Sequence, residues 1–440
     1  MDQEITEVVV RLVYQLAVIL LAAKVAGEVC LRYLKVPPVL GELAAGIIIG
    51  PYALGGVHLW GFGPLFPGAE VAGESVGSIP LSPELYSLAQ VAAIVLLFAA
   101  GLETNLRRFV RYAGPASLVA VGGVVLPFAL GDAVTVLFGF ADGFGDPEAL
   151  FMGAVLTATS VGITVRVLED LGKLDSPEGT TVIAAAVVDD VLGILVLTVV
   201  IRVSDAGTFS ILSVAAIAAK AVGFWLALTA LGIVLSKPIS RLLESFRVPG
   251  AVVAGSLALA FLGAGLAESF GLAMIIGAYS VGLALSDTNL ALLLEEPIRG
   301  VHQALVPVFF VAMGMLVDLS TVQGAVNFAV VVTLVAIVGK VVGCGLPAVA
   351  TGFNLKGALR VGVAMLPRGE VALIIAGVAL AKGVVDSDIY GVAIIMTVVT
   401  TFLAPVVLVP MFRRWGSGRR NGDALADEPG DEFVGGTGGL

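Results

Sequence analysis

Charged residues are scarce in this chain of 440 residues: they make up 13% of it, whereas a soluble domain carries about a quarter. Hydrophobic residues make up 58%, and the mean hydropathy is +1.04. A helix needs about 20 apolar residues to cross a bilayer, so this content suffices for about a dozen crossings. The composition therefore excludes an ordinary water-soluble enzyme and a receptor with a single span.

Cysteine and histidine are also rare, with two residues of each. Cys30 and Cys344 lie in apolar stretches, so the sequence predicts neither a disulfide framework nor a zinc site. His58 and His302 are isolated and lie next to expected loops, so we expect no metal site at either. The net charge of −10 disfavours nucleic-acid partners. We also expect no bound cofactor and no nucleotide-binding domain.

What fills the chain is a series of long apolar runs. The run at residues 8–26 is too long and too continuous for the alternating strands of a membrane barrel, so an all-α polytopic membrane protein is predicted. Residues 1–4 lack the basic start of a cleaved signal peptide, and the first run is therefore expected to remain as a helix. The runs predict thirteen spans, at residues 8–33, 38–53, 84–102, 112–140, 147–171, 177–203, 210–236, 249–267, 271–287, 297–316, 322–350, 355–382 and 388–412.

The distribution of lysine and arginine predicts the orientation in the membrane. Seventeen of the 24 basic residues fall in one set of alternate loops and the C-terminal segment, and two, Arg202 and Lys382, fall in the opposite set. Because basic loops stay in the cytoplasm, we expect the N-terminus outside the cell and the C-terminus inside, in the inner or plasma membrane. Residues 414–440 are rich in glycine and acidic residues, and are expected to form a disordered cytoplasmic tail.

Charged residues inside the expected spans are candidates for function, because each costs roughly 2.5–3.5 kcal/mol at mid-bilayer. Lys340 and Arg368 are the basic residues that lie deepest in their spans. Glu42, near the start of the second span, is better explained as a solvated carboxylate at a helix start than as a residue at the mouth of a cavity.

Two adjacent carboxylates, Asp189 and Asp190, stand near the middle of the sixth span. Successive residues of a helix point about 100° apart, so the two side chains cannot face the same wall. We expect Asp189 to pair with Lys340, at matching depth in the eleventh span, and Asp190 to face a cavity. The alternative for Asp189 and Lys340 is a closed ion pair that only fixes the packing.

Two spans are interrupted at their middles. Hydroxyl residues and a glycine interrupt the fifth span at residues 157–164, and Pro367 breaks the twelfth within residues 362–370. In the predicted orientation these spans run in opposite directions, as an inverted repeat of spans 1–6 and 8–13 joined by span 7 requires. Paired breaks of this kind indicate an ion site near the midplane. Arg368 and Glu370 would supply charges to the exposed helix ends, either in contact with the ion or as a mutual structural pair.

Together these motifs resemble the monovalent cation:proton antiporters of the second class, especially the NapA-type sodium/proton branch. The resemblance covers residues 8–412. It rests on PVLGE at 38–42 with GP at 50–51, TATSVGIT at 157–164, VDDVLG at 188–193, PVFF at 307–310 with a glycine at 314, GK at 339–340 and PRGE at 367–370.

The resemblance implies a transmembrane antiporter domain over residues 1–413. It implies thirteen helices, a homodimer, a dimerisation part (about 8–53 and parts of 210–316) and a mobile core part (about 84–203 and 297–412). It also implies elevator-type alternating access. The family's essential ion-binding aspartate falls on Asp190, its lysine-paired aspartate on Asp189 with Lys340, and its hydroxyl-bearing crossover on Thr159 and Ser160.

These residues lead to the hypothesis of an antiporter that exchanges Na⁺ or Li⁺ for H⁺. The cation and protons compete for Asp190, with Thr159 as a further oxygen ligand of the transiently bound Na⁺. If Asp189 leaves Lys340 when the cation binds, the lysine can release a second proton and the exchange is electrogenic. A K⁺/H⁺ antiporter or potassium-efflux pathway on the same fold is the alternative. An intramembrane aspartyl protease is disfavoured, because adjacent carboxylates on one helix cannot share one water.

Overall fold

The computed structural model describes residues 2–56, 58–59, 63–66, 81–206, 211–318, 326–381 and 383–420, which are largely helical. The helices are α1 (Asp2–Val29), α2 (Pro38–Ile49), α3 (Pro83–Glu103), α4 (Leu106–Leu137), α5 (Pro147–Thr157), α6 (Val161–Asp170), α7 (Pro177–Ala206), α8 (Ile211–Glu244), α9 (Ala251–Ser269), α10 (Met274–Leu285), α11 (Asn289–Met315), α12 (Val326–Ala350), α13 (Leu355–Ala364), α14 (Glu370–Ala381) and α15 (Ser387–Arg414). A π-helical turn (Cys30–Leu34) extends α1, and a 3₁₀ turn (Leu54–Gly56) precedes the two-residue antiparallel strands β1 (His58–Leu59) and β2 (Gly63–Pro64).

Helix starts coincide with capping residues in the sequence. The side chains of Asn105, Asn354 and Asp386 accept hydrogen bonds from the amide three residues ahead, at the starts of α4, α13 and α15. Proline occupies the first position of α2, α3 and α5, where its missing N–H removes no helical hydrogen bond. Local signals therefore account for many of the breaks between the apolar runs.

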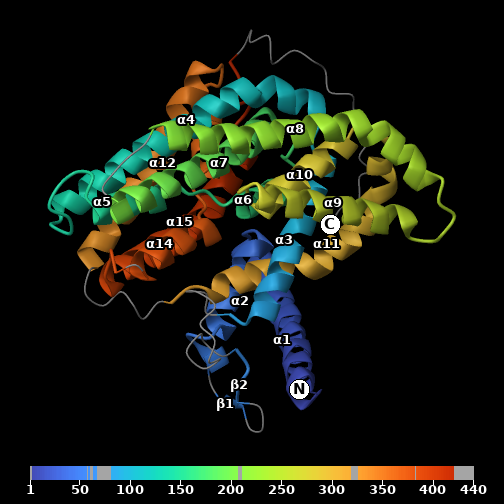
Figure 1. Cartoon of the computed structure of the whole chain (residues 1–440), viewed down its shortest axis with the longest axis horizontal. Coiled ribbons are helices and arrows are strands. Elements are labelled where there is room, and N and C mark those ends of the chain that lie inside the picture. The colour runs from blue at the N-terminus through green and yellow to red at the C-terminus, as the bar shows by residue number, and fades with distance from the viewer. Residues whose placement is uncertain are drawn as a thin grey trace.

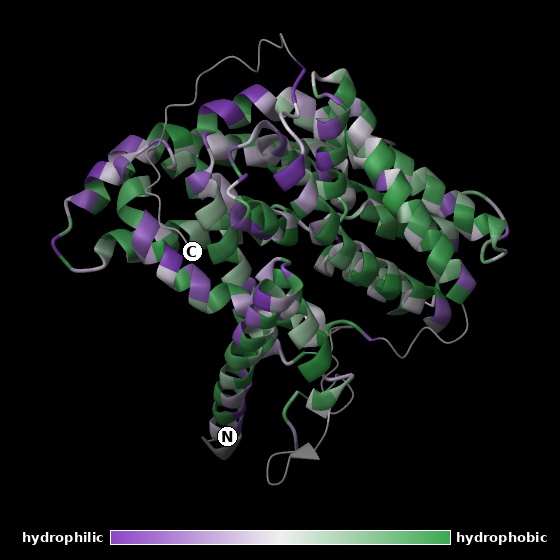
Figure 2. Ribbon diagram, turned by 180° about the vertical axis from the view of Figure 1, so that it is seen from behind, coloured by the Kyte–Doolittle hydropathy of each residue, from purple (hydrophilic) through white to green (hydrophobic). Residues whose placement is uncertain are grey.

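Eleven segments of the described chain are helical, long enough and apolar enough to cross a membrane, and α10 is a shorter apolar helix of 12 residues. Much of the helical ribbon in Figure 2 has the green colour of hydrophobic residues. The predicted all-helical, multi-pass architecture is thus confirmed, and the protein is a membrane protein of the lipid bilayer. The count of thirteen spans and the inverted repeat remain predictions.

The described helices pack as two groups. One group contains α4, α5, α7, α12, α13, α14 and α15, and the other contains α1, α2, α3, α9, α10 and α11, with α8 against α10. Helix α6 contacts α7 on one side and α2 and α3 on the other, so it lies where the two groups meet. Helix α1 projects from the body of the molecule, with the N-terminus at its far end (Figure 1). The expected division put residues 84–103 in the core part, whereas α3 packs mainly against α10 and α11.

Glycines allow helices within each group to approach closely. Gly122 of α4 faces Gly343 of α12, and Gly101 of α3 faces Gly282 of α10. A Cβ atom on any of the four would meet the backbone of the opposite helix. Backbone contact at small residues is a main source of attraction between helices in a membrane, and here it fixes the crossings that surround the site described below.

The C-terminal segment differs in part from its prediction. Residues 415–420, expected to belong to a disordered tail, pack against the loop between α12 and α13, and Arg419 is 5% exposed. The reason is that Arg419 stacks on aromatic rings and donates to a backbone carbonyl, which the glycine-rich composition of the segment conceals. The rest of the predicted tail, residues 421–440, lies outside the described residues.

Candidate functional site

The two predicted helix breaks are present and lie side by side. Helix α5 ends at Thr157 and α6 begins at Val161, while α13 ends at Ala364 and α14 begins at Glu370. The Ser160 amide donates a hydrogen bond of 2.7 Å to the Pro367 carbonyl, which joins the two non-helical segments directly. Four half-helix ends therefore meet at one place inside the protein.

Hydroxyl groups reinforce this crossing. The Thr164 hydroxyl donates to the carbonyl of Ala364 at 2.7 Å, and the Thr159 hydroxyl lies 3.4 Å from the carbonyl of Met365. The Thr159 hydroxyl has a single hydrogen, which it donates either to this carbonyl or to the neighbouring Asp189 carboxylate. The sequence placed Thr159 and Ser160 at the crossing, but the role of Thr164 was missed, although it belongs to the same run of hydroxyl residues.

Two buried cations face the carbonyl ends of the half-helices. Arg368 is 1% exposed and donates to the carbonyls of Leu156, at 2.7 Å, and Leu366, at 3.1 Å, near the ends of α5 and α13. Lys340 donates to the Thr157 carbonyl at 2.6 Å. Unsatisfied carbonyls give a helix C-terminus a partial negative charge, so both cations compensate charge that the breaks create.

Lys340 also forms the predicted ion pair with Asp189. Its Nζ lies 3.0 Å from Oδ1 of Asp189 and donates a third hydrogen bond, of 2.9 Å, to the carbonyl of Gly123 in α4. Lys340 is 0% exposed and Asp189 2%. All three donors of the ammonium group are therefore used, and α4, α5, α7 and α12 are joined at this point.

Asp190 lies at a pocket, whereas Asp189 is held in the ion pair with Lys340. Asp190 lines this pocket together with Thr159, Ser160 and Gly369 at the two breaks. The opposite wall comes from the second group of helices, including Leu97 of α3 and Phe309 of α11. The pocket thus lies between the two groups, with carboxylate, hydroxyl and backbone oxygens on one side, which are the ligands that a hard cation prefers.

Of the two residues that were expected to supply charge to the twelfth span, the structure describes the side chain of Arg368 alone. Arg368 serves the ends of the half-helices through carbonyl contacts, whereas the side chain of Glu370 lies outside the described residues. Arg368 also lines a second pocket with Thr397 and Thr401 of α15. The sequence offered no signal for this second pocket, because both threonines stand in an uninterrupted apolar helix.

Two other expectations were wrong. Glu42 is not solvated but 2% exposed, because α2 packs against α1 and α11. His302 does not adjoin a loop: it is 3% exposed inside α11, and its Nε2 lies 3.5 Å from a carboxylate oxygen of Glu169 in α6. Pro297 had been interpreted as the start of this span, but α11 begins eight residues earlier, at Asn289, and contains the proline.

Discontinuous helices that cross beside adjacent carboxylates are typical of ion-coupled membrane transporters, which is the class that this fold and site indicate. The sequence profile of the family described as "Sodium/hydrogen exchanger, transmembrane" matches residues 17–414. This chain belongs to that family, and the expected kinship with cation:proton antiporters is confirmed. Its finer placing in the NapA-type branch remains a prediction.

Relatives agree with this membership, and a solved structure has a similar fold. The chain is 39% identical to the high-affinity Na(+)/H(+) antiporter NhaS3 of Synechocystis sp., over 90% of this chain and 89% of the relative. It is 36% identical to the Na(+)/H(+)-K(+) antiporter GerN of Bacillus cereus, over 90% and 95%. Its fold is similar to that of the sodium proton antiporter MjNhaP1 from Methanocaldococcus jannaschii, with a TM-score of 0.60 at 18% identity, over 92% of this chain and 97% of that chain.

Replacing Arg368 by methionine is expected to destabilise the protein. The carbonyls of Leu156 and Leu366 would lose their donor, and an unsatisfied buried carbonyl costs about 1–3 kcal/mol. Thermal unfolding in detergent would show a lower midpoint, with partial recovery in Arg368→Lys. The control is Arg299→Met, since the exposed Arg299–Glu295 pair contributes at most about 1 kcal/mol. An Arg368→Met protein as stable as this control would contradict the assigned role.

Proposed function

We propose that this protein exchanges Na⁺ or Li⁺ for H⁺ across a cell membrane, with the cation and protons competing for Asp190. The observation that carries the proposal is the pocket in which Asp190 meets Thr159 and Ser160 between the two groups of helices. The proposal also draws on the relatives, whose names describe sodium/proton antiporters. A metal ion is here the cargo, and the site residues are its transient ligands.

Competition at a carboxylate accounts for antiport without a lid. An ionised Asp190 can bind the cation with help from the hydroxyls of Thr159 and Ser160 and from backbone carbonyls at the breaks. A protonated Asp190 is neutral. A bare carboxylate inside the membrane is costly, so the site moves between the two membrane faces only when a cation or a proton has neutralised it.

The arrangement of the pocket supports movement of one helix group against the other. One wall carries Asp190 and both breaks, whereas the opposite wall is formed by α3, α10 and α11. Sliding of the first group as a rigid body would carry the pocket across the membrane, as in an elevator. The group around α10 and α11 would then be the fixed, dimerising part of a homodimer. Thirteen spans in two inverted repeats, with the N-terminus outside and the C-terminus in the cytoplasm, complete the proposal.

Electrogenic exchange follows if the Asp189–Lys340 pair takes part. The pair lies next to the cation pocket, since Asp189 and Asp190 are adjacent and Thr159, which lines the pocket, also neighbours Asp189. Binding of a cation would draw Asp189 away from Lys340, and the lysine would then release a proton. Two protons would move for each cation, and such a protein would serve pH and sodium homeostasis.

Potassium is the second candidate cargo. GerN, which is 36% identical to this chain, is named as a Na(+)/H(+)-K(+) antiporter. Because Na⁺ and K⁺ are both hard cations bound by oxygen ligands, the donor set around Asp190 does not distinguish them.

Exchange measured under three cation gradients tests both candidates. In proteoliposomes with a pH-sensitive dye inside, the purified protein is expected to move protons when Na⁺ or Li⁺ is added, and at least about tenfold less when K⁺ is added, a difference of about 1.4 kcal/mol in apparent affinity. Liposomes without protein are the control. Equal responses to K⁺ and Na⁺ would favour the second candidate, and no response to any of the three would refute antiport.

A further inference from the structure

A second buried ion pair joins α13 to α7, the helix that carries Asp189 and Asp190. Nη1 of Arg360, in α13, lies 2.8 Å from a carboxylate oxygen of Glu178, in the first turn of α7, and both side chains are 5% exposed. The other Arg360 donors bind the carbonyls of Met411, Trp415 and Gly416, where α15 ends. One guanidinium therefore joins α7, α13 and α15.

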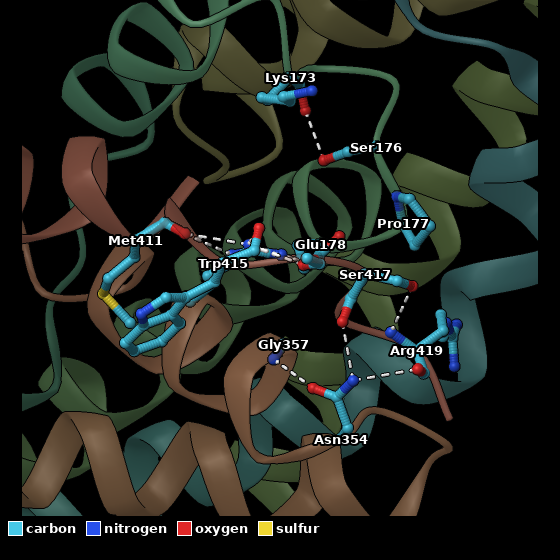
Figure 3. A network of polar contacts seen from close by, with 12 residues as sticks. Lys173, Ser176, Pro177, Glu178, Asn354, Gly357, Met411, Trp415, Ser417 and Arg419 are labelled. Atoms are coloured by element: carbon cyan, nitrogen blue, oxygen red, sulfur yellow. Dashed lines mark hydrogen bonds and ion pairs between the residues drawn. The ribbon is translucent and has the colours of Figure 1, made fainter. Parts of the chain in front are cut away.

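The segment at residues 415–420, here called the clasp, crosses the start of α13. Asn354 caps α13 by accepting from the Gly357 amide at 3.0 Å, and its own amide group donates to the carbonyls of Ser417, at 2.8 Å, and Arg419, at 3.0 Å. The Asn354 backbone amide donates to the carbonyl of Gly418 at 2.9 Å. Figure 3 shows Asn354 between Gly357 and the clasp. The clasp thus orients the residue that caps the helix.

Arg419 holds the clasp in place. Its guanidinium lies 4.0 Å from the ring centre of Phe353 and 4.7 Å from that of Tyr112 in α4, and it donates to the Thr351 carbonyl at 2.9 Å. Stacking on two rings with a backbone hydrogen bond is a strong, specific environment for arginine. The clasp is therefore attached to α4 and to the loop before α13, in addition to α15.

Helices α13 and α7, which the Arg360–Glu178 pair joins, both extend to the ion site. Helix α13 has ten residues, about 15 Å in length, and at its far end the carbonyls of Ala364 and Met365 face Thr164 and Thr159. Helix α7 carries Asp189 and Asp190 about three turns beyond Glu178. Because a short helix moves as a rigid rod, a shift at the clasp would move the Met365 carbonyl and, through it, Thr159, which lines the pocket with Asp190.

We propose that the clasp and the Arg360–Glu178 pair fix the position of α13 along its axis relative to α7. In this way they position the oxygen ligands around Asp190. Arg360, Glu178 and Gly418 are positioning residues: they touch neither the pocket nor the cation. The inference rests on the proposed function, since it concerns the affinity of the same site for its cation.

A pair of glycines in the clasp gives a matched test. A Cβ atom on Gly418 would fall on the Glu178 carboxylate and 2.8 Å from the Cα atom of Gly357, whereas a Cβ atom on Gly416 would meet nothing within 4 Å. Displacements of about 1 Å in a positioned site can change its performance by about 100-fold. Gly418→Ala is therefore expected to raise the apparent KM for Na⁺ about tenfold and to change the maximal rate less than about twofold.

Gly416→Ala is expected to behave as the unaltered protein does. A merely structural clasp would lower the amount of folded protein and the maximal rate but leave KM unchanged, so an unchanged KM in Gly418→Ala overturns the inference. If Gly418→Ala does not fold, Glu178→Gln replaces it: the amide keeps the shape but weakens the hold on Arg360, and a raised KM is again expected and an unchanged KM overturns the inference. Absence of Na⁺-driven proton flux in the unaltered protein would instead refute the proposed function, and the inference with it.

Discussion

Replacing Asp190 by asparagine is expected to reduce sodium-driven proton flux at least about 100-fold while leaving the fold intact. The carboxylate is the charged group that the pocket presents beside Thr159 and Ser160. A 100-fold loss corresponds to about 2.8 kcal/mol, since 1.4 kcal/mol is a factor of ten in affinity. An amide neither neutralises a bound cation nor exchanges a proton, so both halves of the cycle fail together.

A second carboxylate supplies the control for this variant. Asp132 of α4 is also buried, at 9% exposure, and accepts a hydrogen bond from the Gly145 amide that an asparagine oxygen could still accept. Asp132→Asn should therefore transport normally in the same proteoliposomes. Normal exchange by Asp190→Asn, in protein that elutes as a single species in detergent, would show that the cation binds elsewhere.

The helices were largely predictable, because membrane spans leave strong signals in composition. Residues 84–102 were expected to be a span, and α3 occupies Pro83–Glu103. Both breaks were predicted from proline and hydroxyl residues within apolar runs, since these residue types weaken helical hydrogen bonding. Where the prediction failed, at the start of α11, a proline inside a helix had been interpreted as its beginning.

Contacts between charged side chains in the site could be predicted from the sequence. Contacts between those side chains and backbone carbonyls could not. A charge in a membrane needs a counter-charge, and this requirement, with the matching depth of the two residues in their spans, indicated the pairing of Asp189 with Lys340. The carbonyl of Gly123, and those that bind Arg368, carry no mark in the sequence, because every residue has a carbonyl group. For the same reason, the packing of residues 415–420 could not be expected from their composition.

Lys340→Gln is expected to have two separate effects. Glutamine has no charge and two N–H donors in place of three, so Asp189 would stay buried without its cation. The carbonyls of Gly123 and Thr157 and the Asp189 carboxylate could not all keep a donor. Breaking a buried pair in this way costs about 3–5 kcal/mol, which would lower the midpoint of thermal unfolding. Transport, if the lysine carries the second proton, should become electroneutral: an imposed membrane potential would accelerate the unaltered protein but not the variant.

The double variant Asp189→Asn/Lys340→Gln separates these two effects. Replacing both members of a buried ion pair by neutral groups of similar size is often nearly neutral for stability, so the double variant should regain most of the lost midpoint. Its transport should nevertheless stay electroneutral, because no ammonium group remains to release a proton. A Lys340→Gln protein that still responds to the membrane potential would mean that the second proton travels by another group. A double variant no more stable than the single one would mean that the lysine stabilises mainly through the carbonyls at the end of α5 rather than through Asp189.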